Sequence, residues 1–126
     1  MNRDEFVKQY TAFLERALAY SEKSRREGLL ALDNALDSEK EEERDIFEYG
    51  LRFVIDGTDA VIIEKILDNI IAQEKDEYTR LFKTIQKEAV LGIQAGTNSR
   101  ILYFSLNSLT DISLKDDKIY AYIKSI

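Results

Sequence analysis

The sequence contains no cysteine, histidine, proline or tryptophan. The absence of cysteine excludes a disulfide framework, a thiolate nucleophile and cysteine ligands for a metal. The absence of histidine removes the usual structural zinc sites, the Ser/His and Cys/His relays, and the side chain that titrates near neutral pH. Because these gaps exclude much of enzyme chemistry, we expect a protein that is not an enzyme and needs no cofactor.

Long hydrophobic runs and an excess of positive charge are also missing. No apolar run approaches the ~20 residues that a membrane-spanning helix needs, and the polar start, Met1–Phe6, does not resemble a secretory signal. The 24 acidic residues against 18 basic ones give a net charge of −6, which argues against binding nucleic acid through its phosphates. We therefore expect a cytoplasmic chain with no membrane insertion and no nucleic-acid partner.

The residues that are abundant favour helices. Ala, Leu, Glu, Lys and Arg dominate, and the five glycines leave few points of interruption. Apolar residues recur three and four positions apart in every long segment, which is the pattern of an amphipathic helix. The sequence predicts an all-α fold: a single domain over residues 1–126, built as a small bundle of four or five helices with one of them long.

Helix boundaries in the first half follow from the apolar pattern and one glycine. Asp4–Leu36 is predicted as one long helix, or as two helices with a bend near Gly28. The charge run Asp37–Asp45 is interpreted as a solvated linker or the exposed start of the next helix. That helix extends from about Ile46 to Asp56 and is apolar on more than one face, which predicts burial.

A corner between two helices is predicted at Asp56-Gly57-Thr58-Asp59. Gly57 can adopt the left-handed conformation that ends a helix, and Thr58 or Asp59 can accept hydrogen bonds from the first amides of the following helix. The same acids could be interpreted as a carboxylate pair for acid–base catalysis, as could Asp116 and Asp117. Capping and first-turn placement explain them better.

The second half contains one long apolar stripe. Nothing between Glu74 and Ile85 breaks a helix, so local physics predicts a continuous helix over Ala60–Ala95. Such a helix would carry the tail far from its own chain, which predicts a swapped homodimer. Asn98 or Ser99 can cap a further helix, and Ser113–Asp116 resembles a capping box for the tail.

A basic cluster, Lys23–Arg26, leads into an apolar run and then an acid, Asp33. On a straight helix Arg25 and Asp33 would lie about 12 Å apart along the axis, so both charges would be available to an outside partner. The alternative is an ordinary solvated turn stabilised by the i,i+4 pairs Glu22–Arg26 and Lys23–Glu27. On the residues alone, this second interpretation is favoured.

Three segments together resemble a known family. They are Ser24–Leu32 (SRREGLLAL) followed by an acid, Tyr49–Asp59 (YGLRFVIDGTD) and Glu88–Leu102 (EAVLGIQAGTNSRIL). The second is similar to the "GLRLVVDGTD" corner, and the third to the "EGxLSIQAGENPRxL" tail, of the MotA/PomA stator subunits of the bacterial flagellar motor. Residues 18–75 thus resemble the family's cytoplasmic loop, and residues 86–106 its C-terminal tail.

The resemblance implies a partner. In the family, the residues that match Arg25 and Asp33 interact with oppositely charged residues of the rotor switch protein FliG. The resemblance therefore implies a partner-binding group and a corner group. These are Arg25, Arg26, Glu27 and Asp33 for the partner, and Asp56, Gly57 and Asp59 for the corner. The resemblance also implies that the glycine and leucines of the first segment are packing residues: Gly28, Leu29, Leu30 and Leu32.

The departures from the family are as informative as the match. Only Lys75–Ile85 stands where the family inserts its third and fourth membrane helices, so the resemblance implies that the helices on either side meet as a hairpin, in contrast to the continuous helix that local physics predicts. The first two membrane helices are missing as well, so this chain alone cannot conduct ions. Asp33 replaces the usual Glu, and Ser99 replaces the tail proline. We expect a membrane-free protein at the flagellar motor that binds FliG or the stator. The alternatives are a self-associating structural protein and an engineered stator fragment, although no Gly/Ser linker marks a fusion.

Overall fold

The computed structural model describes residues 1–37 and 45–113. In chain order the elements are α1 (Arg3–Glu27), the 3-10 turn η1 (Leu29–Ala31), α2 (Leu32–Asp37), α3 (Ile46–Ile55), α4 (Ala60–Ala72), α5 (Glu77–Gln94) and α6 (Ser99–Asn107). The described ranges contain no strand, so the predicted all-α bundle with one long helix is confirmed. The six α-helices in these ranges exceed the predicted four or five.

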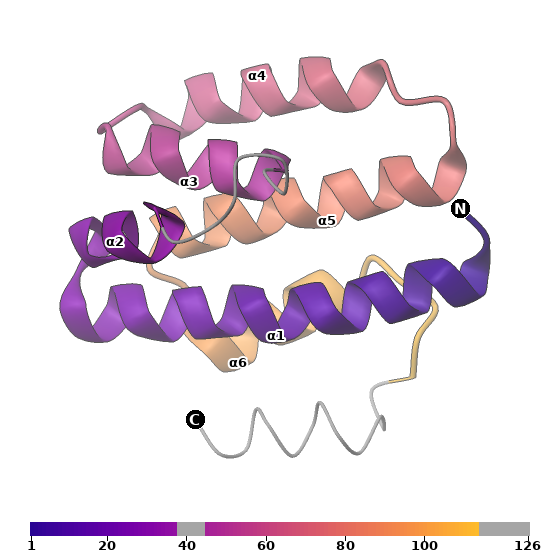
Figure 1. Ribbon diagram of the computed structural model, residues 1–126, viewed down its shortest axis with the longest axis horizontal. Coiled ribbons are helices and arrows are strands. Elements are labelled where there is room, and N and C mark those ends of the chain that lie inside the picture. The colour runs from indigo at the N-terminus through magenta and orange to yellow at the C-terminus, as the bar shows by residue number, and fades with distance from the viewer. Residues whose placement is uncertain (38–44, 114–126) are drawn as a thin grey trace.

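Helix α5 lies in the middle of the bundle, between α1 on one side and the α3–α4 pair on the other (Figure 1). It also contacts α6, which packs against α1. The core fills the space between these helices. Its largest fully buried side chains are Tyr10, Tyr103, Phe6, Phe47, Leu14, Leu18, Leu32, Leu36, Leu51, Ile63, Leu67 and Ile85. Burying each aliphatic or Phe side chain stabilises the fold by roughly 1.5–3 kcal/mol relative to exposure.

The first predicted helix is divided at Gly28. Helix α1 ends at Glu27, and Gly28 has a φ of 92°, a backbone conformation that residues other than glycine rarely adopt. The chain then makes the single turn η1 before α2 begins. Arg25 and Asp33 therefore lie on different helices, and the spacing expected for a straight helix does not apply to them.

The prediction of a continuous helix over Ala60–Ala95 is wrong. Helix α4 ends at Ala72, and Asp76 caps α5 by accepting hydrogen bonds from the backbone N–H and the hydroxyl of Thr79, at 2.9 and 2.7 Å. The carboxylate of Glu74 accepts further bonds from the backbone N–H groups of Lys75 and Asp76. The two helices form an antiparallel hairpin (Figure 1). The argument for a swapped homodimer loses its basis, because α5 returns along α4 to its own chain.

Other boundaries follow side-chain caps. Asp45 accepts a bond from the N–H of Glu48 at the start of α3, and Asn98 accepts one from Ile101 at the start of α6. Most of the charge run (38–44) and the tail from residue 114, including Asp116 and Asp117, lie outside the described residues. Among the helices that are described, none combines the length and the apolar character needed to cross a membrane.

Candidate partner-binding surface

The predicted partner-binding residues and the predicted corner lie at one end of the bundle. The last turn of α1, the turn η1, the start of α2 and the α3–α4 connection meet there (Figure 1). The α4–α5 turn lies at the opposite end, where the amino group of Met1 is 3.3 Å from the carboxylate of Asp76. We refer to the first end, formed by residues 25–34 and 56–59, as the corner end.

The charged residues of the last turn of α1 differ in their pairing. Arg26 is 3.7 Å from Glu22, and Lys23 is 3.2 Å from Glu27, so both expected i,i+4 pairs are present. Arg25 is exposed and makes no ion pair within residues 1–37 and 45–113. Of this group, Arg25 is therefore the cation most available to a partner.

The 3-10 turn determines which side chains face outward after Gly28. With three residues per turn, side chains three positions apart point the same way. Leu29 packs against the core and Leu32 is fully buried, whereas Leu30 is 75% exposed and Asp33 is also exposed. The turn thus places an apolar side chain and an acid together on the outer face of the corner end.

Asp33 lies beside the helix corner. Together with Arg52, Ile55 and Asp56 it lines a cavity of about 110 Å³. Arg52 is held by the buried carboxylate of Glu48 at 2.9 Å and by Asp37 at 3.4 Å. The hydrogen bond that Arg52 donates to Glu48 is the main cause that raises the pKa of Arg52 above its usual value, so the guanidinium stays cationic. The sequence analysis missed Arg52, although its i,i+4 spacing from Glu48 was visible.

The corner itself is built mainly from backbone hydrogen bonds. Gly57 has a φ of 82°, and the N–H groups of Gly57 and Thr58 donate to the carbonyls of Val54 and Phe53, each at 3.0 Å. This is the Schellman arrangement at a helix C-terminus. Asp59 caps α4 through the N–H of Val61 at 3.5 Å. Asp56 is exposed and lines the cavity that it shares with Asp33.

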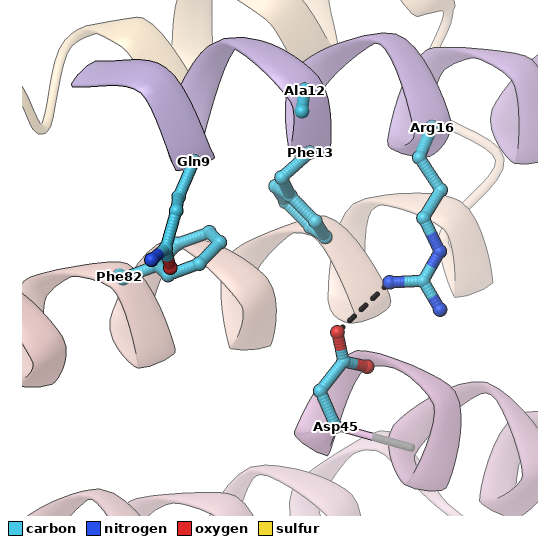
Figure 2. Close-up of a pocket in the computed structure, with 6 residues that line it drawn as sticks. All are labelled: Gln9, Ala12, Phe13, Arg16, Asp45 and Phe82. Carbon is cyan, nitrogen blue, oxygen red and sulfur yellow. Dashed lines mark hydrogen bonds and ion pairs between the residues drawn. The ribbon is translucent and has the colours of Figure 1, made fainter. Parts of the chain in front are cut away.

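A second hollow lies between α1, α5 and the start of α3 (Figure 2). This groove of about 280 Å³ is lined by Gln9, Ala12, Phe13, Arg16, Asp45 and Phe82. At its end Arg16 pairs with Asp45 at 2.9 Å and stacks over the ring of Phe47 at 4.9 Å. Asp45 also accepts a bond from Gln86 at 3.1 Å, so these polar groups hold three helices together.

These two hollows are smaller than the roughly 300–1,000 Å³ of typical small-molecule sites, whereas a third has a volume of about 410 Å³ and is lined by Phe104, Asn107, Ser108, Thr110 and Ile112. Within the described ranges no group of carboxylates is arranged to hold a metal ion. The corner end exposes Arg25, Leu30 and Asp33, a combination of charged and apolar side chains suited to contact with another macromolecule.

Comparison with known proteins gives one distant relative. No protein-family model matches the sequence, and no solved structure matches it significantly. Motility protein A from Treponema phagedenis is 33% identical over 78 residues, which cover 62% of this chain and 29% of that protein. The chain therefore spans less than a third of the length of this relative. The similarity supports a motility-related role.

Proposed function

We propose that the chain is a non-catalytic, stator-like module that acts in the cytoplasm at the flagellar motor and binds the rotor switch protein FliG. The corner end is the binding surface. Arg25 and Asp33 each face an opposite charge of the partner, and Arg26 and Glu27 assist once they leave Glu22 and Lys23. The proposal extends the distant similarity to Motility protein A, which by itself supports only a link to motility.

One observation carries the proposal: Arg25 and Asp33 are exposed at one end of the bundle, and neither makes an ion pair within the described ranges. Surface charges that lack partners in their own chain keep their hydration until a partner arrives, and they then steer association and orientation. The surrounding backbone is well defined by the glycine turn at Gly28 and the capped corner at Asp59. Both charges are thus presented from a structured surface.

The α4–α5 hairpin gives further support, which also rests on the family resemblance. The resembling family inserts its last two membrane helices between the segments that match α4 and α5, and here the turn from Gln73 to Asp76 joins them directly. This turn lies at the end of the bundle opposite the corner end (Figure 1). In a protein with membrane helices at this turn, the corner end would project away from the membrane, toward a rotor.

The proposal is tested by charge reversal. Arg25→Glu and Asp33→Lys should change the free energy of unfolding by less than about 1 kcal/mol, because exposed charges contribute little to stability. Affinity for purified FliG should fall by roughly 10- to 100-fold, because like charges then face each other across the interface. Isothermal titration calorimetry at low and high salt measures both the affinity and its screening.

Lys8→Glu is the matched control, because it makes the same charge change on an exposed lysine of α1 at the other end of the bundle. It should bind like the wild type. An opposite reversal in FliG should restore binding to Arg25→Glu. Wild-type affinity in both reversed variants at low salt would contradict the proposal.

A second candidate function is self-association, favoured by the outer face of α4. Ile62 is 52% exposed and Ile70 37% exposed, and Ile66 lies half-buried between them on the same stripe. The spacing is symmetric about Ile66, so a twofold axis there would pair the ends of the stripe with those of a second copy. Sedimentation at increasing concentration separates this homodimer from a monomeric rotor-binding module.

A further inference from the structure

The corner end carries three types of exposed side chain within one short segment of the chain. Arg25 supplies a positive charge, Leu30 an exposed apolar side chain and Asp33 a negative charge. The apolar residue lies between the two charges in the chain, and the turn η1 places it on the same outer face as Asp33. Sequence reasoning assigned Leu30 to packing, and the structure corrects this, because the side chain is 75% exposed.

The exposure of Leu30 follows from the local backbone. Leu29, Leu32 and Leu36 supply the apolar contacts that attach this segment to the bundle. Gly28, with its φ of 92°, turns the chain out of α1, so that Leu30 falls on the opposite side from Leu29 and Leu32. Its side chain therefore adds little to the stability of the fold.

Charges at the rim of an interface and an apolar residue at its centre contribute differently to binding. Rim charges steer encounter and set orientation, and most of the affinity comes from a few well-buried anchors surrounded by groups that exclude water. In the proposed interface Arg25 and Asp33 act as the rim charges. Among the exposed members of the 25–34 segment, Leu30 is the large apolar side chain.

From this arrangement we infer that Leu30 is the apolar anchor of the corner end. It inserts into an apolar hollow that the partner protein presents between an acidic group, which faces Arg25, and a basic group, which faces Asp33. The inference rests on the proposed function, and it adds that burial of Leu30 supplies most of the affinity for the partner. The corner end recognises a partner surface on which an acidic group, an apolar hollow and a basic group follow one another, so that each faces its complement among Arg25, Leu30 and Asp33.

The test compares Leu30→Ser with Leu30→Met in binding to purified FliG. Leu30→Ser removes the anchor and should lower the affinity by at least about fivefold, as truncation of an anchor does. The dependence of the affinity on salt should stay as in the wild type, because both charges remain. Leu30→Met keeps the apolar volume and should bind like the wild type. Arg25→Glu should instead weaken the dependence on salt.

Leu109→Ser is the control, because it replaces another exposed leucine (38%) outside the corner end. It should bind like the wild type, and the thermal midpoints of the variants should agree. If Leu30→Ser binds like the wild type and Arg25→Glu does not, the anchor is overturned while the proposed function stands. If the wild-type chain itself does not bind FliG, both are overturned. Loss of binding in Leu30→Ser with an unchanged salt dependence supports the anchor.

Discussion

At the scale of single residues, the fold depends on polar side chains that satisfy backbone groups where helices begin. Asp45, Asp59, Asp76 and Asn98 each accept a hydrogen bond from a backbone N–H in the first turn of a helix. Those N–H groups have no partner within the helix, so each cap replaces a bond to water and fixes the first turn. The caps supply the helix boundaries that the absence of proline leaves undefined.

Asp76 gives a prediction for the pH dependence of stability. The hydrogen bonds from the hydroxyl and the N–H of Thr79 lower the pKa of Asp76 from 3.8 to about 2. Because the folded state holds the carboxylate charged, the stabilisation is fully present above the unfolded-state pKa and is lost as the pH falls from about 4 to about 2. Urea unfolding across this window should show a smaller loss of stability for Asp76→Asn than for the wild type.

Other groups also titrate in this window, which makes the comparison between variants necessary. Bonds from Lys83 and Arg3 lower the pKa values of Glu74 and Asp111, and both carboxylates remain in Asp76→Asn. The difference in unfolding free energy between the variant and the wild type, followed across this pH window, therefore reports the contribution of Asp76 alone. Parallel curves for the variant and the wild type would show that the cap at the α4–α5 turn has no differential effect.

At the scale of elements, the close packing of α3 on α5 depends on a missing side chain. A Cβ atom at Gly50 would lie 2.6 Å from Cγ2 and 2.9 Å from Cγ1 of Val90. Valine on a helix has one strongly preferred rotamer, so it cannot easily move aside. Gly50→Ala should therefore lower the free energy of unfolding by about 1–3 kcal/mol, the usual cost of overpacking a core.

The same chain offers a matched control for this prediction. A Cβ atom at Gly92 would also come within 2.6 Å of a neighbour, but that neighbour is Cδ1 at the flexible end of Leu102. Gly92→Ala should cost less than Gly50→Ala in denaturant unfolding. Adding Val90→Ala to Gly50→Ala should recover part of the loss. Equal costs at the two glycines would contradict the steric explanation.

Helix type and most caps could be predicted from the local sequence, whereas the hairpin of α4 and α5 was implied by the family resemblance alone. Periodicity identified the helices because each buries one apolar stripe. The stripe continues through residues 73–76, so periodicity alone gave no sign of a break. The signal that was missed is Asp76 followed by Glu77 and Thr79, which is an N-cap pattern. Contact between α4 and α5 then favours the hairpin, and such contact cannot be deduced from local sequence.

For the candidate site, the sequence suggested which charges could contact a partner and could not predict their neighbours. Arg25 and Asp33 were identified from a resemblance, which also assigned Leu30 to packing. Its exposure depends on the single 3-10 turn after Gly28. The approach of Asp56 to Asp33 depends on how α2 lies against the end of α3. Both are consequences of tertiary structure.

At the scale of the whole molecule, α4 is the helix held by the fewest buried side chains for its length. It lies at the edge of the bundle (Figure 1), and its buried residues are Ile63, Leu67 and Ile71. Helices α1 and α5 are held by a larger share of the core. Elements with few buried contacts open at lower free energy than the core. In dilute solution, amide hydrogen exchange should therefore be faster in α4 than in α1 and α5.

The dependence of exchange on protein concentration shows whether α4 is exposed in a monomer or covered by a second copy in a homodimer. If a second copy covers the Ile62–Ile66–Ile70 stripe, mass action should slow exchange in α4 as the protein concentration rises, while exchange in α1 and the corner end stays unchanged. The variant Ile66→Glu should abolish this effect, because pairing two copies would bury an unpaired charge. Protection of α4 that does not depend on concentration would exclude the homodimer. Protection in dilute solution equal to that of α1 would contradict the expected low local stability of α4.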